Sequence, residues 1–365
     1  MNYHKRLKEL QNLLKEKKLD SLIIDSPIDL LYLTGLSLSL GRLFIDRDKA
    51  KLFVDGRYIE ECQKNSPFPV ENSSDRDFIS YLRSLSHIET IAFDSAFTSY
   101  RNYSSLKDKI REHPDSQLQL IPLENPTKLL RNIKEKEEIT LLKNSAALCA
   151  KGFDYACSLL KEGVSEIELA NEIEIFWKKR GSEKPSFSIN VSFGKNSSMP
   201  HHKADATSLK KGDAVLMDIG VSLEEYQSDM TRVIFFGSPH PELEKIYHIV
   251  RQAQEKALDM CRPGIALGDL DSFSRKIIEE SGYGEYYNHS LGHGIGLETH
   301  EFPAVKDAEP YRNFLLAPGM VFTVEPGIYL PNLGGVRIED TIVVVEDGYE
   351  NLTNRPKDLS IKKFF

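Results

Sequence analysis

Two pairs of carboxylates on strand-like segments are the residues of this chain whose types and spacing most suggest chemistry. Asp218 and Asp229 lie on two neighbouring β-like runs that are separated by a short polar turn. If this turn centres on Leu223 and Glu224, the aspartates lie directly opposite on one face, with Cβ atoms roughly 5 Å apart. Such a pair destabilises a sheet when both residues are ionised. A bulge would shift this register, and a single pair of acids at strand ends is usually solvated.

The second half of the chain repeats the arrangement. Symmetric pairing about Asn332 places Glu325 opposite Glu339, on the runs VFTVEPGIYL and VRIEDTIVVV. Four carboxylates buried in one site would need compensating cations, because uncompensated buried charge costs many kcal/mol. Hard carboxylate ligands together with one imidazole suit Mn²⁺, Co²⁺, Fe²⁺ or Zn²⁺. The two pairs therefore predict a site for two divalent metal ions.

A histidine-rich and glycine-rich segment, HSLGHGIGLETHE at 289–301, offers the imidazole. His289 and His293 are four residues apart, but the intervening glycines argue against a helix and the HExxH pattern is absent. The segment also lacks the GxGxxG spacing of a phosphate-binding loop. A lone histidine is more often structural than a ligand. Here Gly292 and Gly294 allow the backbone to come close to the site, which favours His293 as the fifth ligand.

The elements that must position these residues show a faint internal repeat. Two glycine pairs are 101 residues apart, and three further pairs, one of them acid with acid, are 107 residues apart. A common offset that also pairs an acid with an acid indicates two related halves that face each other. The pairs are Gly163 with Gly264, Gly181 with Gly282, Gly212 with Gly319, Asp218 with Glu325, and Gly220 with Gly327.

The first third of the chain alternates between helical and strand-like segments. An amphipathic helix with Leu7, Leu10 and Leu14 on one stripe precedes β-like runs at 21–25, 51–55 and 90–94. A polar segment then begins a long helix with apolar residues from Ile139 to Phe153. We therefore expect an α/β N-terminal domain over residues 1–124 and a second domain over residues 125–365.

The composition of the 365-residue chain excludes several classes of protein. A net charge of −8 and a pI near 5.8 argue against a nucleic-acid-binding protein. No apolar run approaches the roughly 18 residues needed to span a bilayer, and the charged N-terminal helix has no apolar signal core. The four cysteines form no CxxC pair. We expect reduced thiols in a cytoplasmic protein that does not associate with membranes.

In sequence order, the candidate ligands and their contexts resemble the pita-bread metallopeptidases, and most closely the Xaa-Pro aminopeptidase and Xaa-Pro dipeptidase branch. The early stretches LLYLTGL and LFVDGRYIEEC are similar to the creatinase-type N-terminal domain of that family. The resemblance covers nearly the whole chain. It implies an α/β (α+β) protein, in which a smaller creatinase-type α/β domain precedes a pita-bread catalytic domain with pseudo-twofold halves. The contexts are Asp218 in MDIG, Asp229 in SDMTR, His293 in GHGIG, Glu325 in EPG and Glu339 in RIEDT.

The resemblance also implies how these residues divide between two divalent metal ions. Mn²⁺ is the first candidate, and Co²⁺, Zn²⁺ or Fe²⁺ are the others. Asp218 and Asp229 would hold one ion, and His293 and Glu325 would hold the second. Asp229 and Glu339 would bridge the two ions.

Further residues take roles in the reaction through the same resemblance. His201 in MPHHKAD matches the family's substrate-side histidine, with its neighbour His202 as the alternative, and His300 in ETHE matches the histidine that contacts the reacting peptide. Glu325 is the candidate for moving a proton to the leaving nitrogen. The catalytic set is thus His201, His300 and Glu325.

Two other residues are expected on the substrate side of the site. His289 matches a position just outside the metal ligands. Arg337 lies two residues before Glu339 on the same strand face, so it should point into the site and orient a carboxylate. A surface arginine is the alternative for Arg337.

The implied activity is removal of the N-terminal residue from a peptide with proline at the second position, by an enzyme that could be a homodimer. A dipeptidase must also hold the free carboxylate of that proline, and some dipeptidase relatives place an arginine four residues after the position of His300. That position is Ala304 here, with Lys306 and Arg312 as the nearest cations beyond it. This favours an Xaa-Pro aminopeptidase, with an Xaa-Pro dipeptidase (prolidase) as the alternative. A non-catalytic binding protein of the same fold is a remote alternative, because all five ligand positions are filled.

Overall fold

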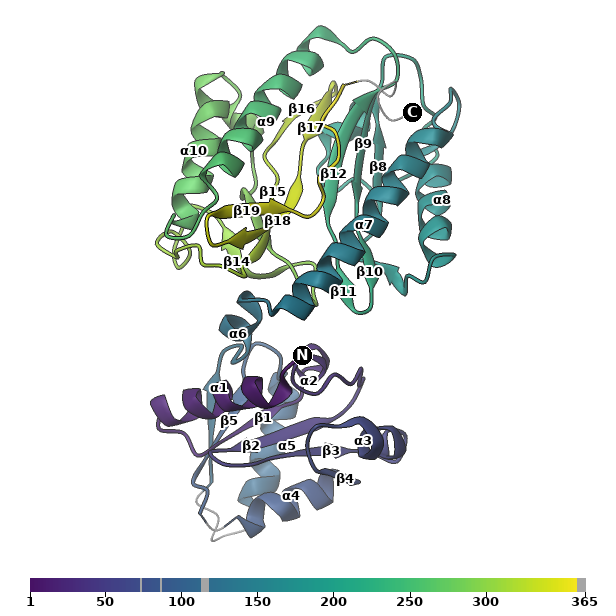
Figure 1. Cartoon of the computed structure of the whole chain (residues 1–365). Coiled ribbons are helices and arrows are strands. Elements are labelled where there is room, and N and C mark those ends of the chain that lie inside the picture. The colour runs from purple at the N-terminus through teal and green to yellow at the C-terminus, as the bar shows by residue number, and fades with distance from the viewer. Residues whose placement is uncertain (73, 86, 113–117, 360–365) are drawn as a thin grey trace. The chain divides into compact units, whose positions relative to one another are not determined.

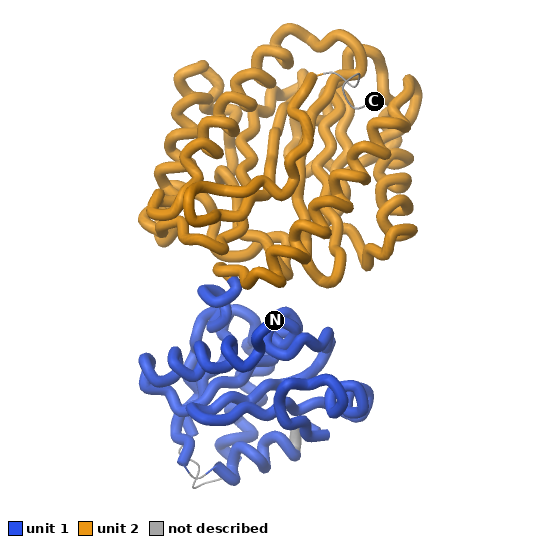
Figure 2. Tube along the Cα trace, in the orientation of Figure 1, with its two compact units in different colours: residues 1–131 blue, residues 132–365 orange. Residues whose placement is uncertain are grey.

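The computed structural model describes residues 1–72, 74–85, 87–112 and 118–359. The chain divides into two compact units, Met1–Arg131 and Asn132–Phe365 (Figure 2). None of the described helices is both long enough and apolar enough to cross a bilayer.

Unit 1 is a sheet with helices around it, in the strand order β4-β3-β2-β1-β5-β6 (Figure 1). Strand β1 pairs antiparallel with β2 and parallel with β5. The predicted runs at 21–25, 51–55 and 90–94 form β1, β3 and β5, and Leu10 and Leu14 of the first helix are fully buried. The elements are α1 (Tyr3–Glu16), β1 (Ser21–Ile24), α2 (Pro27–Thr34), β2 (Arg42–Asp46), β3 (Ala50–Val54), α3 (Ile59–Asn65), β4 (Val70–Asn72), α4 (Asp75–Ser84), β5 (Thr90–Asp94), α5 (Tyr100–Arg111), β6 (Gln119–Leu123) and α6 (Lys128–Asn132).

The division between the units falls seven residues beyond the predicted boundary at 124. The segment that follows β6 belongs to unit 1 because its polar groups bind acids of that unit. The backbone N–H of Asn125 donates to Asp94, and the Thr127 hydroxyl and the Arg131 guanidinium both donate to Asp29. The polar composition of this segment resembles that of a linker, and only these buried partners reveal its place in unit 1.

Unit 2 consists of two halves, each of which begins with two helices and continues with strands. In the first half, two helices accompany the sheet β12-β9-β8, and in the second half two helices accompany the sheet β14-β13-β15-β18-β19. Figure 1 shows the strands between α7 and α8 on one side and α9 and α10 on the other. The first half contains α7 (Lys136–Leu159), α8 (Glu166–Lys178), β7 (Lys184–Pro185), β8 (Asn190–Phe193), the 3₁₀ helix η1 (Gly194–Ser198), β9 (Ala214–Ile219), β10 (Val221–Leu223), β11 (Tyr226–Gln227) and β12 (Met230–Phe235). The second half contains α9 (Pro241–Met260), α10 (Leu267–Glu280), the 3₁₀ helix η2 (Gly284–Tyr286), β13 (Gly292–Gly294), β14 (Glu301–Val305), β15 (Val321–Val324), β16 (Gly327–Leu330), β17 (Gly334–Arg337), β18 (Asp340–Val345) and β19 (Gly348–Asn351).

Backbone angles confirm that the halves are related. Three of the glycine pairs predicted from the repeat have matching left-handed φ angles, a conformation that favours glycine. Hydrogen bonds repeat as well, because Gly163 donates to Leu209 in one half and Gly264 donates to Leu316 in the other. The φ angles are +89° and +87° for Gly163 and Gly264, +92° and +85° for Gly181 and Gly282, and +94° and +88° for Gly212 and Gly319.

The predicted register is wrong in the first half and correct in the second. Asp218 pairs with Thr231, because the turn centres on Glu224 and Glu225, both with positive φ, one residue later than predicted. A two-residue hairpin turn of this kind fits the twist of the strands. Asp229 therefore lies diagonally across from Asp218 on the same face, since it is two positions before Thr231.

In the second half, the β15–β18 pairing and the β16–β17 pairing follow the same register on either side of the glutamates. Val324 pairs with Asp340, and Gly327 pairs with Arg337. This register places Glu325 opposite Glu339, as the sequence predicts. The two acids of the second half thus face each other directly, whereas the two acids of the first half are displaced by two residues along the ladder.

Candidate metal centre

The five predicted metal ligands come together between the two halves of unit 2. Asp218 lies in β9, Asp229 directly precedes β12, His293 is central in β13, Glu325 follows β15 and Glu339 precedes β18. The Nε2 atom of His293 lies 3.4 Å from a Glu325 oxygen and 3.7 Å from an Asp229 oxygen. One ligand atom each of Asp229, His293 and Glu339 lies within 4.8 Å of the other two.

The cluster is buried at its base and open at its rim. Asp229 and Glu339 are 4% and 1% exposed, whereas the side chains of Asp218 and Glu325 are 19% and 17% exposed. Burial raises the pKa of Asp229 and Glu325 well above their ordinary values, and the negative charge of Glu339 raises both further. These carboxylates repel one another where little solvent screens them. The protein alone therefore does not compensate their negative charge.

Two further observations show that the five candidate ligands fit divalent cations. Oδ1 of Asp229 is buried and has no hydrogen-bond partner among the residues that the structure describes. Nδ1 of His293 is 3.1 Å from the carbonyl oxygen of Gly294, which can only accept, so Nδ1 carries the proton and Nε2 offers its lone pair to the cluster. Burial lowers the pKa of His293 to about 4, so the ring is neutral at neutral pH. A neutral imidazole and an unpaired carboxylate oxygen suit a cation.

Threonines on the same strand faces hold the carboxylates. The Thr231 hydroxyl donates to Glu339 at 2.7 Å, and the Thr323 hydroxyl donates to Glu325 at 3.2 Å. Sequence reasoning missed both residues. The available signal was that each threonine lies two residues from a ligand carboxylate, because alternation along a strand places such residues on one face.

The glycines next to His293 serve strand packing. A Cβ atom added at Gly292 would lie 2.0 Å from the carbonyl oxygen of Thr323, and one at Gly294 would lie 2.5 Å from that of Phe302. Glycine at these positions therefore lets β13 lie tightly between β15 and β14. This close packing brings His293 next to Glu325.

Arg337 is buried and binds inside the site. Its guanidinium donates to Asp218 at 2.5 Å, to the Tyr329 hydroxyl at 2.7 Å and to the Thr231 hydroxyl at 3.1 Å. The bond to Asp218 matches the expected orientation of a carboxylate. Tyr329, which sequence reasoning missed, lies 2.9 Å from Nε2 of His289. Because Nδ1 of His289 faces the Ser290 carbonyl and burial lowers the pKa of His289 to about 4, we infer that Tyr329 donates to His289.

The histidines expected to contact the substrate lie at the rim. The ring centroids of His300 and His293 are 4.1 Å apart, and partial burial lowers the pKa of His300, so its imidazole is neutral at neutral pH. His201 is exposed. It lies close enough to His289 and His300 for a charge on its ring to lower the pKa of both. His202 turns away from the rim, because its Nε2 lies 2.7 Å from a Glu166 oxygen. The structure thus favours His201 over His202 as the residue that faces the site.

Glu166, His202 and Asp205 form a second group with metal-like spacing. Glu166 is fully buried, but its two oxygens already accept from the backbone N–H groups of Phe193 and Asp205 and from the Asn196 amide, besides their contact with His202. These contacts occupy the carboxylate. The group therefore anchors the loop that carries His201, and its hydrogen bonds leave no need for a cation.

The metal-free protein is expected to lose stability as Glu339 ionises. Burial first, and then the charge of Asp218, raise the pKa of Glu339 from 4.5 to about 7. Between these pH values the folded state keeps a proton that the unfolded chain has lost, so folding becomes less favourable as the pH rises. Glu339→Gln removes this titration and should gain on the order of 3 kcal/mol relative to the wild type between pH 4.5 and pH 7.

Denaturant unfolding of both EDTA-treated proteins at several pH values measures this difference. The comparison with the variant is needed because His289 and His293, with pKa values lowered to about 4, stabilise the fold as the pH rises. A difference between wild type and variant that stays constant with pH would contradict the account.

The comparisons with known proteins agree with this geometry. The model of metallopeptidase family M24 matches residues 140–346, and that of the creatinase/prolidase N-terminal domain matches residues 6–133. The chain is 37% identical over 355 residues to the Xaa-Pro dipeptidase of Pyrococcus furiosus, covering 97% of this chain and 99% of that protein. Its fold is similar to the Xaa-Pro dipeptidase of Bacillus anthracis, with a TM-score of 0.92, 34% identity, and 98% and 99% of the two chains covered. It is also similar to the X-Pro aminopeptidase of Thermotoga maritima, with a TM-score of 0.86, 32% identity, and 96% and 99% covered.

The fold and the family define a metallo-exopeptidase, with two related halves around a cluster of four carboxylates and a histidine. The chain belongs to metallopeptidase family M24 and carries the creatinase/prolidase N-terminal domain. The prediction of a pita-bread metallopeptidase is thereby confirmed, and divalent metal binding follows from the family. The expectation that the chain is an aminopeptidase finds less support than its alternative, because two curated relatives that match nearly the full length are Xaa-Pro dipeptidases.

Proposed function

We propose that this chain is an Xaa-Pro dipeptidase that uses two divalent metal ions. The observation that carries the proposal is the five-residue centre, in a chain that aligns over 97% of its length with an Xaa-Pro dipeptidase. The same comparisons include an X-Pro aminopeptidase of similar fold, so the fold alone does not decide between the two activities.

Asp218, Asp229, His293, Glu325 and Glu339 would hold the two ions, with Mn²⁺ as the first candidate. When bound, the ions supply Lewis acidity and lower the pKa of water, so that a nucleophile forms at neutral pH. The substrate's free amine would lie near Asp218, whose carboxylate Arg337 orients from the side. An amine bound at this end restricts cleavage to the first peptide bond.

The histidines at the rim would bind the reacting peptide. His300, neutral at neutral pH and beside His293, has an N–H to donate to the scissile carbonyl oxygen as negative charge develops there. His201, on the loop anchored through His202 and Glu166, would hold the substrate beside it. Glu325 would take the proton released at the start of the reaction and pass it to the leaving nitrogen.

The carboxylate of a dipeptide needs a cation on the leaving side, and Lys306 is our candidate. Ala304 pairs with His293 across β13 and β14, so a residue at that position points to the metal side of the strand. Lys306 follows two residues later, directly after the last residue of β14. Its Nζ lies 5.2 Å from the centre of the Tyr311 ring, whereas Arg312 is bound to Asp307 at 2.5 Å. Arg312 is therefore already engaged.

Substrate length tests the proposal directly. The wild type should hydrolyse Xaa-Pro with a higher kcat/KM than Xaa-Pro-Yaa with the same first residue. Lys306→Ala should raise KM for Xaa-Pro by about 10- to 100-fold, the usual range for a lost hydrogen bond to a charged group. Xaa-Pro amide, which lacks the carboxylate, should be cleaved equally by variant and wild type.

Arg312→Ala serves as the matched control, because its exposed guanidinium is paired with Asp307. If Arg312→Ala rather than Lys306→Ala raises KM for Xaa-Pro, the carboxylate contact belongs to Arg312. A wild type that prefers Xaa-Pro-Yaa is an aminopeptidase, and the dipeptidase proposal fails.

A further inference from the structure

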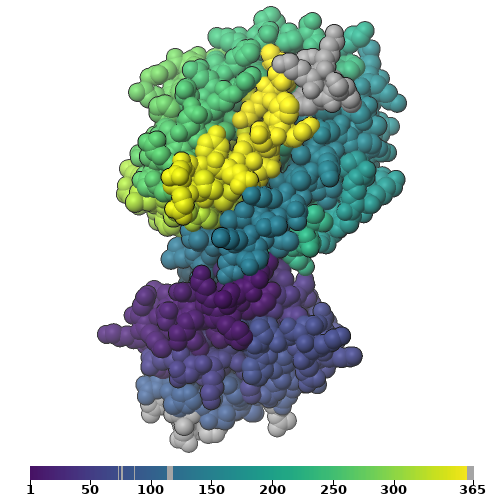
Figure 3. All heavy atoms as spheres, in the orientation of Figure 1, coloured from purple at the N-terminus to yellow at the C-terminus, as the bar shows by residue number. Residues whose placement is uncertain are grey.

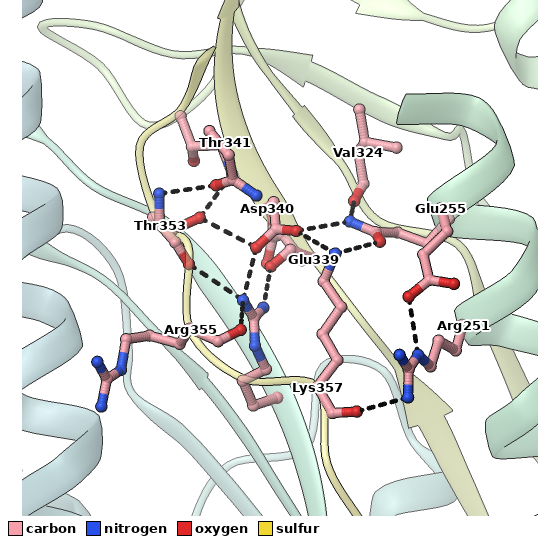
Figure 4. A network of polar contacts seen from close by, with 12 residues as sticks. Arg251, Glu255, Val324, Glu339, Asp340, Thr341, Thr353, Arg355 and Lys357 are labelled. Atoms are coloured by element: carbon pink, nitrogen blue, oxygen red, sulfur yellow. Dashed lines mark hydrogen bonds and ion pairs between the residues drawn. The ribbon is translucent and has the colours of Figure 1, made fainter. Parts of the chain in front are cut away.

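A buried ionic network surrounds Asp340 (Figure 4). Because side chains alternate along a strand, it lies on the face opposite to the candidate metal ligands. Asp340 is fully buried, and Arg232 and Lys357 bind its two oxygens at 2.6 Å and 2.7 Å. Gln254 of α9 donates to the second oxygen at 2.9 Å and accepts from Lys357 at 2.7 Å. The peptidase reaction proposed above uses none of these residues.

The network touches the backbone of the ligand-bearing strands. Strand alternation places Glu339 on the metal side and Asp340 on the other side. The Arg232 guanidinium donates to the backbone carbonyls of Thr231 and Glu339. Gln254 donates to the carbonyl of Val324, the residue before Glu325. Arg232 and Gln254, which both bind Asp340, thus hold the backbone at Glu339 and directly before Glu325.

Residues 353–359, which we name the C-terminal strap, complete this network. In Figure 3 the yellow C-terminal part of the chain runs between the teal and the green parts of unit 2. The carbonyls of Thr353 and Arg355 accept from Arg232, and Lys357 supplies the second cation for Asp340. The strap also reaches both halves, because Arg355 binds Asp154 of α7 and the Lys357 carbonyl accepts from Arg251 of α9.

We propose that the C-terminal strap, through Lys357, Asp340 and Arg232, positions the Glu339 carboxylate and thereby sets the affinity of the metal centre. This inference rests on the proposed role of Glu339 as a metal ligand. Asp340 and Lys357 are positioning residues, since they act on Glu339 through Arg232 and the backbone and touch no substrate. Polar groups that orient metal ligands typically contribute 10- to 100-fold to metal affinity.

A strap that only stabilises the fold predicts a different result. Loss of the buried ion pair between Lys357 and Asp340 would then lower the melting temperature of the metal-free protein. The intrinsic affinity of the folded protein for metal would stay unchanged. Metal affinity measured well below the melting temperature therefore separates positioning from stabilisation.

The test uses Lys357→Met, which removes one charge but keeps the Arg232–Asp340 pair, and Asp340→Asn, which removes the central charge. The full-length proteins are stripped of metal and titrated with Mn²⁺ by calorimetry. We expect the Kd of the weaker Mn²⁺ site to rise about tenfold or more in both variants. Lys357→Arg, which retains a cation, should restore the affinity.

Lys256→Met is the matched control, because Lys256 is on α9 and its side chain is 54% exposed in a pair with Asp259. It should bind Mn²⁺ as the wild type does. If Asp340→Asn does not fold, Lys357→Met alone decides. Unchanged Kd values in a folded Lys357→Met overturn this inference and leave the proposed function intact, whereas a wild type that takes up no Mn²⁺ overturns both.

Discussion

Asp229→Asn is expected to reduce turnover to background and to remove metal from the purified protein. Asp229 is buried between Glu339, Glu325 and His293, and its Oδ1 has no partner among the described residues. The amide of asparagine cannot serve as a bridging anion, since it carries no charge and presents N–H donors in place of one oxygen. Both ions would lose a ligand, so this substitution has the largest effect that we expect from any single residue.

The measurement is kcat at saturating Mn²⁺, together with metal content per chain by elemental analysis. Asp259→Asn is the control, because it makes the same chemical change on an exposed part of α9. It should keep both activity and metal. An Asp229→Asn protein with full metal content and wild-type turnover would show that Asp229 is not a bridging ligand.

His300→Ala and His201→Ala should each lower kcat while the metal content stays nearly intact. Both side chains are assigned to the substrate, and loss of one positioned hydrogen-bond donor typically costs about 10²- to 10³-fold. His300 lies beside His293 and is only partly buried, and His201 is exposed on its loop. These variants should therefore differ from Asp229→Asn in metal content per chain as well as in kcat.

The control is His248→Ala, which removes an exposed histidine of α9 and should change neither quantity. Metal analysis and single-turnover rates with an Xaa-Pro substrate make the comparison. Loss of a metal equivalent in either rim variant would mean that its histidine is a ligand, and the division between ligands and substrate contacts would have to be redrawn.

Much of the catalytic unit is predictable because its halves repeat. Three of the four glycine pairs share left-handed φ angles, and Glu325 lies opposite Glu339 as predicted. The first hairpin was less predictable. A shift of one residue at the turn, from Leu223–Glu224 to Glu224–Glu225, moves Asp229 two residues along the ladder. The shift arises because Glu224 and Glu225 both adopt a left-handed backbone conformation. Glutamate does not usually adopt this conformation, so the sequence pattern does not predict it.

The parts that the sequence does not reveal depend on long-range partners. His201 and His202 are adjacent and chemically identical, and the distant Glu166 separates their roles. The ionic network behind the site has a similar origin. Asp340 and Arg232 each follow a residue that faces the metal side, so alternation points them to the back of the strands. Their pairing with each other and with Lys357 requires the folded chain.

Metal stoichiometry and activity measured on one preparation test the central claim most directly. The protein is treated with EDTA, dialysed, assayed with an Xaa-Pro substrate, and then titrated with Mn²⁺ or Co²⁺ while bound metal is determined by elemental analysis. We predict no activity in the stripped protein and full recovery as bound metal approaches two ions per chain, as a two-metal site requires. Undiminished hydrolysis of Xaa-Pro by a protein without measurable metal would contradict the account.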